Sequence, residues 1–195
     1  MTQASFSSFN SRSINHRSGV LFFSYSLVYL CYNFYVHIMD LTQRAKQIIE
    51  DNLYLTLSTC SQDTPWSTPL WYAVDDKYNF YFISDLASLH VLNIKQNSSV
   101  SFSIYNSQEK PDDVNGVQIK GTAHEIGITE IPQALTAIFK KAGSELFKLR
   151  LKEWNNPKTY TELTKFRIYK LTTNEVYILD TSVLETDKRI QVYLI

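Results

Sequence analysis

The stretch Trp66–Ile94, WSTPLWYAVDDKYNFYFISDLASLHVLNI, decides the fold of this chain. Residues 66–74 and 78–84 are rich in aromatic and aliphatic side chains that alternate with polar ones, a pattern typical of β-strands. Pro69 predicts an edge position or a bulge in the first strand, because proline cannot donate to a ladder. The link between the strands has hairpin length, so they are expected to pair antiparallel. Asp85 follows as the predicted N-cap of a short helix.

The same periodicities extend to both sides of this stretch. An amphipathic helix is predicted from Asp40 to Asn52, in which Asp40 and Gln43 resemble a capping box. Further strands are expected at residues 53–59, 98–105, 117–126, 165–172 and 175–180, with a short one near 190–194, and helices at 131–141 and 144–151. Six or more antiparallel strands with few helices indicate a mainly β fold, a closed or partly closed barrel with flanking helices.

Length and composition restrict the class of protein. The chain has 195 residues, 44% of them apolar, which suits one main domain. The formal net charge is zero and no basic stripe runs along the chain, so no nucleic-acid partner is expected. Cys31 and Cys60 lie in segments of different character, and the histidines form no metal-binding motif. Neither a disulfide framework nor a metal site is therefore predicted.

The first 38 residues differ from the rest of the chain. No acidic residue occurs before Asp40, and residues 20–38 contain no Asp, Glu, Lys or Arg. Three interpretations stay open: a translation start upstream of a natural one at Met39, a membrane anchor or targeting segment, or an ordered extra element. The uncharged run has the length of a membrane span, but its polar residues and scattered tyrosines make a membrane anchor less favoured. We treat residues 1–38 as an N-terminal extension and residues 39–195 as the working domain, expected in the cytoplasm.

The chain lacks the motifs of several large enzyme classes. It contains no G-x-S-x-G elbow, no G-x-G-x-x-G and no Walker loop. The adjacent acids Asp75-Asp76 and Asp112-Asp113 are typical of solvated turns. No side chain stands out as a catalytic acid or base, so catalytic residues are left unassigned.

Residues 84–93, SDLASLHVLN, form the strongest local candidate for a binding site. They lie at the end of a predicted strand and the start of a helix, where unpaired N–H groups and a partial positive charge suit a phosphate. Ser84 and Ser88 add hydroxyl donors, and His90 adds a donor that can become cationic. The alternative from the residues alone is a capped helix whose serine and histidine side chains face water.

In order and spacing, these segments resemble the FMN-binding split-barrel proteins of the pyridoxamine 5'-phosphate oxidase-like superfamily. The resemblance rests first on residues 66–94, with a small residue-Pro-apolar-aromatic strand, a tight turn, an aromatic strand ending in Ser, and a helix start bearing S-x-H. It continues in AKQIIEDNLYLTLST upstream, in V-x-I-x-G-T-A at Val117–Ala123 and in R-I-Y-K-L-T at Arg167–Thr172. It covers most of residues 39–180 and implies a six-stranded antiparallel split barrel.

The resemblance also implies a cofactor, a partner and a site. FMN would lie at the interface of a homodimer, and a small molecule would be its substrate or electron donor. The residues expected to hold the phosphate or to support that turn are Ser84, Ser88, His90 and Asn93. Those expected to flank the flavin ring, partly through backbone groups, are Ser67, Thr68, Leu70 and Trp71.

The sequence departs from the pyridoxamine 5'-phosphate oxidases proper in two places. Those enzymes carry an Arg-Lys pair where this chain has Leu89-His90. They also carry a C-terminal R-x-H segment that grips the substrate, whereas the tail here, DKRIQVYLI, has Arg189 without a following histidine. Charge-assisted contacts to a dianionic substrate would be few, so oxidation of vitamin B6 is not expected.

The leading functional hypothesis is an FMN-dependent oxidoreductase of unassigned substrate, in which the cofactor performs the chemistry. A non-catalytic flavin-binding or stress-related module is an alternative. A third hypothesis keeps the barrel and exchanges FMN for a deazaflavin or for haem, with His90 or His124 as the axial ligand. A purely structural dimer without a ligand is the fourth.

Overall fold

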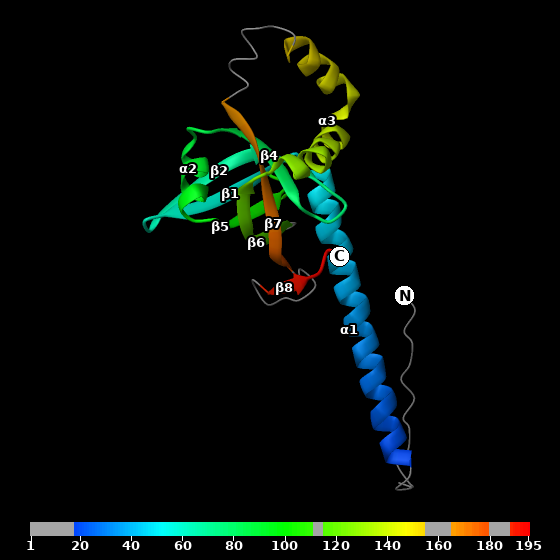
Figure 1. Ribbon diagram of the computed structural model, residues 1–195. Coiled ribbons are helices and arrows are strands. Elements are labelled where there is room, and N and C mark those ends of the chain that lie inside the picture. The colour runs from blue at the N-terminus through cyan, green and yellow to red at the C-terminus, as the bar shows by residue number, and fades with distance from the viewer. Residues whose placement is uncertain (1–17, 111–114, 155–164, 180–187) are drawn as a thin grey trace. The chain divides into compact units, whose positions relative to one another are not determined.

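The computed structural model of the chain describes residues 18–110, 115–154, 165–179 and 188–195. The chain divides into two compact units, Met1–Met39 and Asp40–Ile195. The second unit contains the strands and is called the barrel unit below (Figure 1). Of the helices in the described ranges, none is long and apolar enough to span a membrane.

The first helix, α1, spans Ser18–Asp51 and passes through Asp40 without a break. The prediction that a helix begins at Asp40 with a capping box is therefore wrong. Residues 20–38 contain neither proline nor glycine, so no helix breaker separates them from the predicted start. The predicted apolar spacing is confirmed beyond that point. The buried apolar side chains of α1 in the barrel unit are Leu41, Ala45, Ile48 and Ile49.

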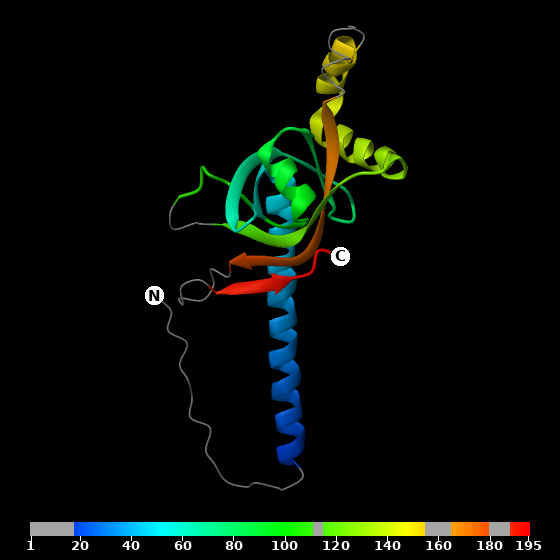
Figure 2. The same cartoon turned by 60° about the vertical axis from the view of Figure 1, so that its left-hand side comes forward.

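The strands of the barrel unit pair antiparallel in one curled sheet (Figures 1 and 2). Their bounds are β1 Tyr54–Ser61, β2 Thr64–Trp71, β3 Ala73–Val74, β4 Phe80–Asp85, β5 Ser99–Tyr105, β6 Gly116–Glu125, β7 Phe166–Leu179 and β8 Arg189–Val192. Neighbouring strands follow the order β2-β1-β5-β6-β7-β4-β3, and β8 also pairs with β7. The predicted mainly β barrel with flanking helices is confirmed.

The described sheet has eight strands rather than the predicted six. The stretch 66–74 forms two strands because Tyr72 does not pair in the sheet and separates β2 from β3. The side chain of Tyr72 is buried, and its Oη donates to the carbonyl of Ile49 at 2.6 Å. The strands expected at 165–172 and 175–180 are one long strand, β7, which pairs with β4, β6 and β8. The short strand expected near the C-terminus is β8.

Two further helices flank the sheet: α2, Leu89–Gln96, and α3, Ile131–Trp154, which a short 3-10 turn, η2, Ile128–Glu130, precedes. The two segments predicted at 131–141 and 144–151 belong to α3, which Gly143 interrupts with a φ of 72°, a conformation that favours glycine. The predicted helix start at Asp85 is wrong by one turn. The Asp85 carboxylate instead accepts from the N–H of Ala87 at 2.8 Å, in a turn that precedes α2.

Aromatic side chains fill the interior of the barrel. Those at most 3% exposed in the main core are Tyr72, Phe80, Phe82, Phe102 and Tyr169. A smaller cluster lies on the other face of β4, where Tyr81 packs with Ala137 and Ile138 of α3. β4 is buried on both faces from Phe80 to Phe82, whereas Ile83 near its end is exposed on the outer face. The buried part of the strand anchors Ser84, which follows on the inner face.

At Gly121, the backbones of β6 and β7 leave no room for a side chain. The register of the two strands shifts between Lys120 and Gly121, and a Cβ atom at this glycine would overlap the carbonyl oxygen of Thr172. The glycine of the V-x-I-x-G-T-A segment is therefore required by backbone approach.

Asp75 is not the solvated turn residue that the sequence predicts. It is half-buried, and its carboxylate accepts from the backbone N–H of Asn79 and from Tyr81 Oη, each at 3.0 Å. Burial acts to raise the pKa of Asp75, but the hydrogen bonds from Asn79 and Tyr81 outweigh it, so the pKa is lowered. Asp76 is exposed as expected, and Asp112-Asp113 lies outside the described residues.

Candidate functional site

The side chains predicted to hold a phosphate meet at one end of the barrel. Ser84 Oγ, at the end of β4, lies 2.7 Å from His90 Nε2 of α2 and 3.0 Å from Ser88 Oγ. Ser88 Oγ lies 3.2 Å from the same ring nitrogen and donates to the carbonyl of Asp85 at 2.7 Å. We call this hydrogen-bonded group of Ser84, Ser88 and His90 the β4–α2 cluster.

The β4–α2 cluster has a buried part and an accessible part. Ser84 and His90 are 7% and 6% exposed, whereas Ser88 is only half-buried. Burial lowers the pKa of His90 below its usual value of 6.5, so the imidazole is neutral at neutral pH. A ligand would therefore meet Ser88 first, while Ser84 and His90 hold Ser88 from behind. His90 acts here as a hydrogen-bonding group and not as a cation.

The start of α2 leaves backbone donors open beside the cluster. Ser88 is the N-cap residue, yet its side chain caps no backbone N–H of the helix. The helical hydrogen bonds begin with the N–H of Leu92, which donates to the carbonyl of Ser88 at 3.0 Å. The N–H groups of residues 89–91 thus have no acceptor within the helix. The carboxylate of Asp85 lies in the preceding turn, so this end of the barrel is rich in donors but carries an acidic group too.

Arg167 of β7 lies beside the cluster, although sequence reasoning did not assign it to the site. It is the direct cross-strand partner of Ser84, so both side chains project from the same face of the sheet. Its Nε lies 3.3 Å from Glu125 Oε1 of β6. The residue stands in the R-I-Y-K-L-T segment, but only the register of β4 against β7 shows which residue it faces.

Tyr169 extends this region into the barrel. Its ring stacks on Phe82 with 5.3 Å between centroids, and the ring of Phe82 lies 6.0 Å from that of His90. Burial, followed by the negative charge of Glu125, raises the pKa of the Tyr169 phenol. Its buried Oη faces the Glu125 carboxylate without a close hydrogen bond to a described residue.

Asn93 connects α2 to the first two strands. Its Nδ2 donates to Thr59 Oγ1 at 3.1 Å, and Thr59 Oγ1 donates to the carbonyl of Trp66 at 3.5 Å. Asn93 is 6% exposed. It therefore supports the helix from inside the barrel, away from the surface that a ligand would touch.

The residues predicted to flank the flavin ring lie on β2, at the edge of the sheet. Strand alternation divides them: Ser67 and Trp71 project from one face, and Thr68 and Leu70 from the other. Ser67 is exposed, whereas Thr68 Oγ1 is buried without a hydrogen bond to any described residue. The four side chains of one β2 strand therefore cannot all face one ring. Backbone groups on the open edge of β2 would have to supply part of the contact.

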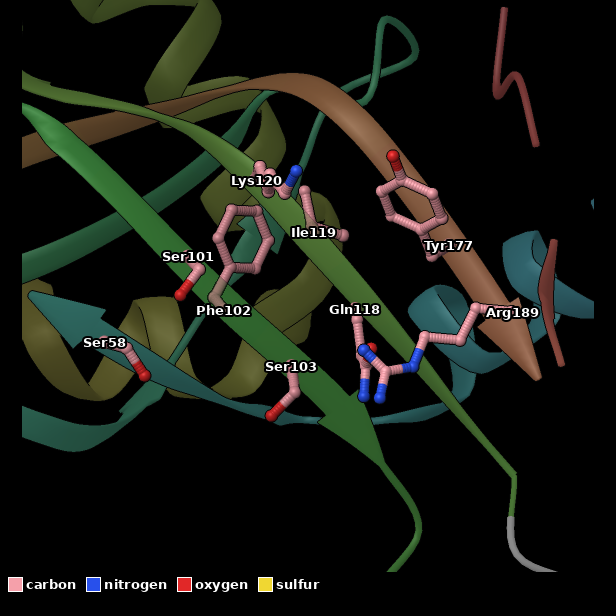
Figure 3. Close-up of a pocket in the computed structure, with 9 residues that line it drawn as sticks. All are labelled: Ser58, Ser101, Phe102, Ser103, Gln118, Ile119, Lys120, Tyr177 and Arg189. Atoms are coloured by element: carbon pink, nitrogen blue, oxygen red, sulfur yellow. The ribbon is translucent and has the colours of Figure 1, made fainter. Parts of the chain in front are cut away.

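The outer face of the sheet carries a shallow groove of about 370 Å³ (Figure 3). We call it the outer-face groove, and its lining residues are Ser58, Ser101, Phe102, Ser103, Gln118, Ile119, Lys120, Tyr177 and Arg189. Figure 3 shows serines on two neighbouring strands and Arg189 reaching in from β8. Lys120 pairs with Glu175 at 2.8 Å, whereas Arg189 forms no ion pair with a described residue. Ser58 Oγ lies 3.5 Å from Ser67 Oγ, so the groove is adjacent to β2.

The two histidines considered as haem ligands have other neighbours. His90 Nε2 lies within hydrogen-bonding distance of two serine hydroxyls, and His124 is exposed with its Nε2 3.5 Å from Glu130 Oε2. Within the described ranges, no three His, Cys, Asp or Glu side chains are grouped so that they could hold a metal ion. Neither histidine presents a free Nε2 to a haem iron in this arrangement.

A curled antiparallel sheet with a short helix over one end defines the class of split-barrel proteins. The chain belongs to the pyridoxamine 5'-phosphate oxidase family, whose model matches residues 41–180. The resemblance drawn from the sequence is thereby confirmed. No curated protein matches the chain.

Solved structures of the same fold have different ligands in their names. The chain is similar to a haem-binding protein from Mycobacterium smegmatis (TM-score 0.59, 16% identity, 78% of this chain and 57% of that one). It is similar to the haem storage protein HutZ from Vibrio cholerae, with a TM-score of 0.56 and 14% identity over 71% of this chain and 94% of that one. It also resembles an FAD-binding protein from Mesorhizobium loti, with a TM-score of 0.51 and 16% identity over 68% of this chain and 88% of that one. At these identities the likeness concerns the fold, and the chain spans little more than half of the Mycobacterium smegmatis protein.

The residues at the barrel end fit the phosphate of FMN better in their donors than in their charge. The backbone N–H groups at the start of α2 are suitable donors, and Ser88 becomes one if its hydroxyl turns away from the carbonyl of Asp85. Arg167 projects from the neighbouring strand. Asp85 and Glu125 bring negative charge to the same end. The donors of this end suit a phosphate monoester, and the two carboxylates oppose one.

Proposed function

We propose that this protein binds FMN, with the phosphate at the β4–α2 cluster, and acts as a flavin-dependent oxidoreductase on a small molecule. The observation that carries the proposal is the Ser84–Ser88–His90 hydrogen-bonded group beside an uncapped helix start. When bound, the flavin supplies the hydride and electron chemistry. The residues of this chain bind the phosphate and orient the ring along the edge of β2.

Family membership and the similar fold of an FAD-binding protein support a flavin as the ligand. Similar folds also occur in proteins named for haem. The hydrogen bonds of His90 and the exposed position of His124 favour the flavin for this chain. The free thiols of Cys31 and Cys60 support a reducing compartment, the cytoplasm, as the place of action.

We further propose a homodimer with the flavin between the two copies. Within one chain, Ser67 faces the side of the outer-face groove, while Ser84 faces the barrel interior. Three of the nine residues that line the groove are serines, whose short side chains permit close approach of a second sheet or of a planar ring on that side. In such a dimer, the flavin ring would contact the open edge of β2 in one copy and the outer-face groove of the other copy.

The visible spectrum of the purified full chain, before and after FMN addition and desalting, tests the proposal. We expect a retained flavin spectrum at about one FMN per chain, since flavin, deazaflavin and haem absorb at different wavelengths. A haem Soret band or a deazaflavin spectrum would contradict the choice of cofactor. A colourless protein that releases all added FMN would contradict flavin binding.

A matched pair of double variants tests the position of the site. Ser88→Ala with His90→Ala is expected to lower FMN affinity at least about 10-fold, because a phosphate donor and its support are lost. Ser98→Ala with His124→Ala removes the same residue types at exposed positions and should leave the affinity unchanged. Circular dichroism checks that both variants fold. Equal affinity of folded Ser88→Ala/His90→Ala and wild type would refute the site.

A further inference from the structure

We infer that Arg167 is the cation that binds the phosphate of the flavin, and that Glu125 holds Arg167 in the ligand-free protein. This inference rests on the proposed function. Sequence comparison led us to expect few positive charges here, because Leu89-His90 stands where an Arg-Lys pair occurs in related enzymes. The register of the sheet supplies a different cation from a strand far away in the sequence.

Strand pairing brings Arg167 to the cluster. Ser84 and Arg167 are direct partners in the β4–β7 ladder, and the preceding pair on the same face is Phe82 with Tyr169. Both members of that preceding pair are buried in the barrel, so the face that carries Arg167 is the inward one. Directly opposite side chains in an antiparallel pair lie about 5 Å apart at Cβ. Arg167 is therefore a neighbour of Ser84, whose hydroxyl is part of the β4–α2 cluster.

The other nearby bases do not occupy this position. Lys170 pairs with Glu130 at 3.2 Å, and its cross-strand partner is Tyr81, which packs outside the barrel under α3. Lys165 precedes β7, and its carbonyl accepts from the N–H of Leu86. It is exposed at the chain's entry to the strand and serves as a charge-matched control.

Glu125 competes with an anion for the guanidinium. Arg167 Nε lies 3.3 Å from Glu125 Oε1, and its Nη1 donates to the carbonyl of Phe166 at 2.9 Å. The two ion-pair side chains are 42% and 41% exposed, so an anion from solvent can reach the guanidinium. A guanidinium binds a phosphate in a bidentate way as readily as it binds a carboxylate. A phosphate at Ser88 would draw Arg167 away from Glu125, and the negative charge of Glu125 opposes that ligand until the exchange occurs.

The experiment measures the affinity of the full chain for FMN and for riboflavin, which lacks the phosphate, by quenching of flavin fluorescence. Arg167→Gln is expected to lower FMN affinity about 10- to 100-fold, and Arg167→Lys to restore part of it. Glu125→Gln is expected to raise FMN affinity about 3- to 10-fold, because the competing carboxylate is gone. None of these changes should alter riboflavin affinity.

Three controls make the test specific. Lys165→Gln removes the same charge two residues away and should change FMN affinity by less than about 3-fold. Asp76→Asn removes an exposed ion-pair partner in the β3–β4 turn, at the other end of β4 from Ser84, and should have no effect. In the Arg167→Gln background, Glu125→Gln should no longer raise the affinity, because Glu125 acts through Arg167.

The outcomes separate this inference from the proposed function. If Arg167→Gln binds FMN like wild type while Ser88→Ala/His90→Ala does not, the cluster stands and the role of Arg167 is overturned. Equal losses in Arg167→Gln and Lys165→Gln, or equal effects on FMN and riboflavin, overturn it too. If wild type binds no FMN, both the proposed function and this inference fall.

Discussion

The β4–α2 cluster and the outer-face groove are both polar, but their side chains are held in different ways. At the cluster, Ser84 and His90 are buried and bonded to each other, and Ser88 alone is partly accessible. In the groove, the serines lie on the open face of the sheet, and Arg189 has no ion-pair partner among the described residues.

This difference indicates different uses for the two regions. A cluster whose members hold one another in place is organised before any ligand arrives, which lowers the cost of binding. The groove mixes serines with apolar side chains and with Lys120 and Tyr177, which both bond to Glu175, and its open face suits contact with a second surface. We therefore propose ligand recognition at the barrel end and contact with a second copy at the outer face.

The largest effect on stability is expected at Gly121, where β6 pairs with β7 between the two regions. Gly121→Val would push a side chain into the carbonyl of Thr172 and separate β6 from β7. We expect a loss of about 3 kcal/mol or more in the free energy of unfolding, measured by urea denaturation. Gly127→Ala is the control, since no atom lies within 4 Å of a Cβ there. Equal stability of Gly121→Val and wild type would mean that β6 and β7 are not closely packed at Gly121.

A second cation in the groove tests the dimer surface. Gln118→Lys places a positive charge in the groove that Arg189 lines, and like charges at a covered surface are costly. We expect the dissociation constant of the dimer to rise about 10- to 100-fold in analytical ultracentrifugation. Thr136→Lys, on the exposed side of α3, should leave it unchanged. A wild-type chain that stays monomeric at all concentrations would remove the outer face from the proposed site.

The smallest effect is expected from titration of the cluster. Because burial lowers the pKa of His90 below 6.5, the unfolded chain binds its proton at a higher pH than the folded chain does. The stability contributed by neutral His90 is therefore present above about pH 6.5 and lost as the pH falls from there towards the lowered pKa. His90→Gln should show a smaller loss of stability between about pH 7 and pH 5.5 in urea titrations. An equal loss in both proteins would show that His90 is not buried as a neutral ring.

Much of the barrel follows from local sequence, because strand alternation and hairpin turns are read from neighbouring residues. The β4–α2 cluster follows for the same reason, since Ser84, Ser88 and His90 lie within one short segment. Arg167 could not be placed beside Ser84 in this way, because their meeting depends on the register between strands that are distant in sequence.

Two errors have a similar origin. The predicted helix start at Asp40 relied on a capping pattern, whereas the upstream residues continue the helix because none of them breaks it. The adjacent acids at Asp75 looked solvated, but Tyr81 and Asn79 come back to Asp75 through the β3–β4 hairpin. Local patterns show what a residue favours, while tertiary pairing decides which partners it meets.

The central claim is that the barrel end recognises the phosphate of FMN. The most direct measurement is the pair of dissociation constants of the full wild-type chain for FMN and for riboflavin, taken under one set of conditions. The account predicts that FMN binds at least about 10-fold more tightly, since the two ligands differ only in the phosphate. Equal affinities, or binding of neither flavin, would contradict it.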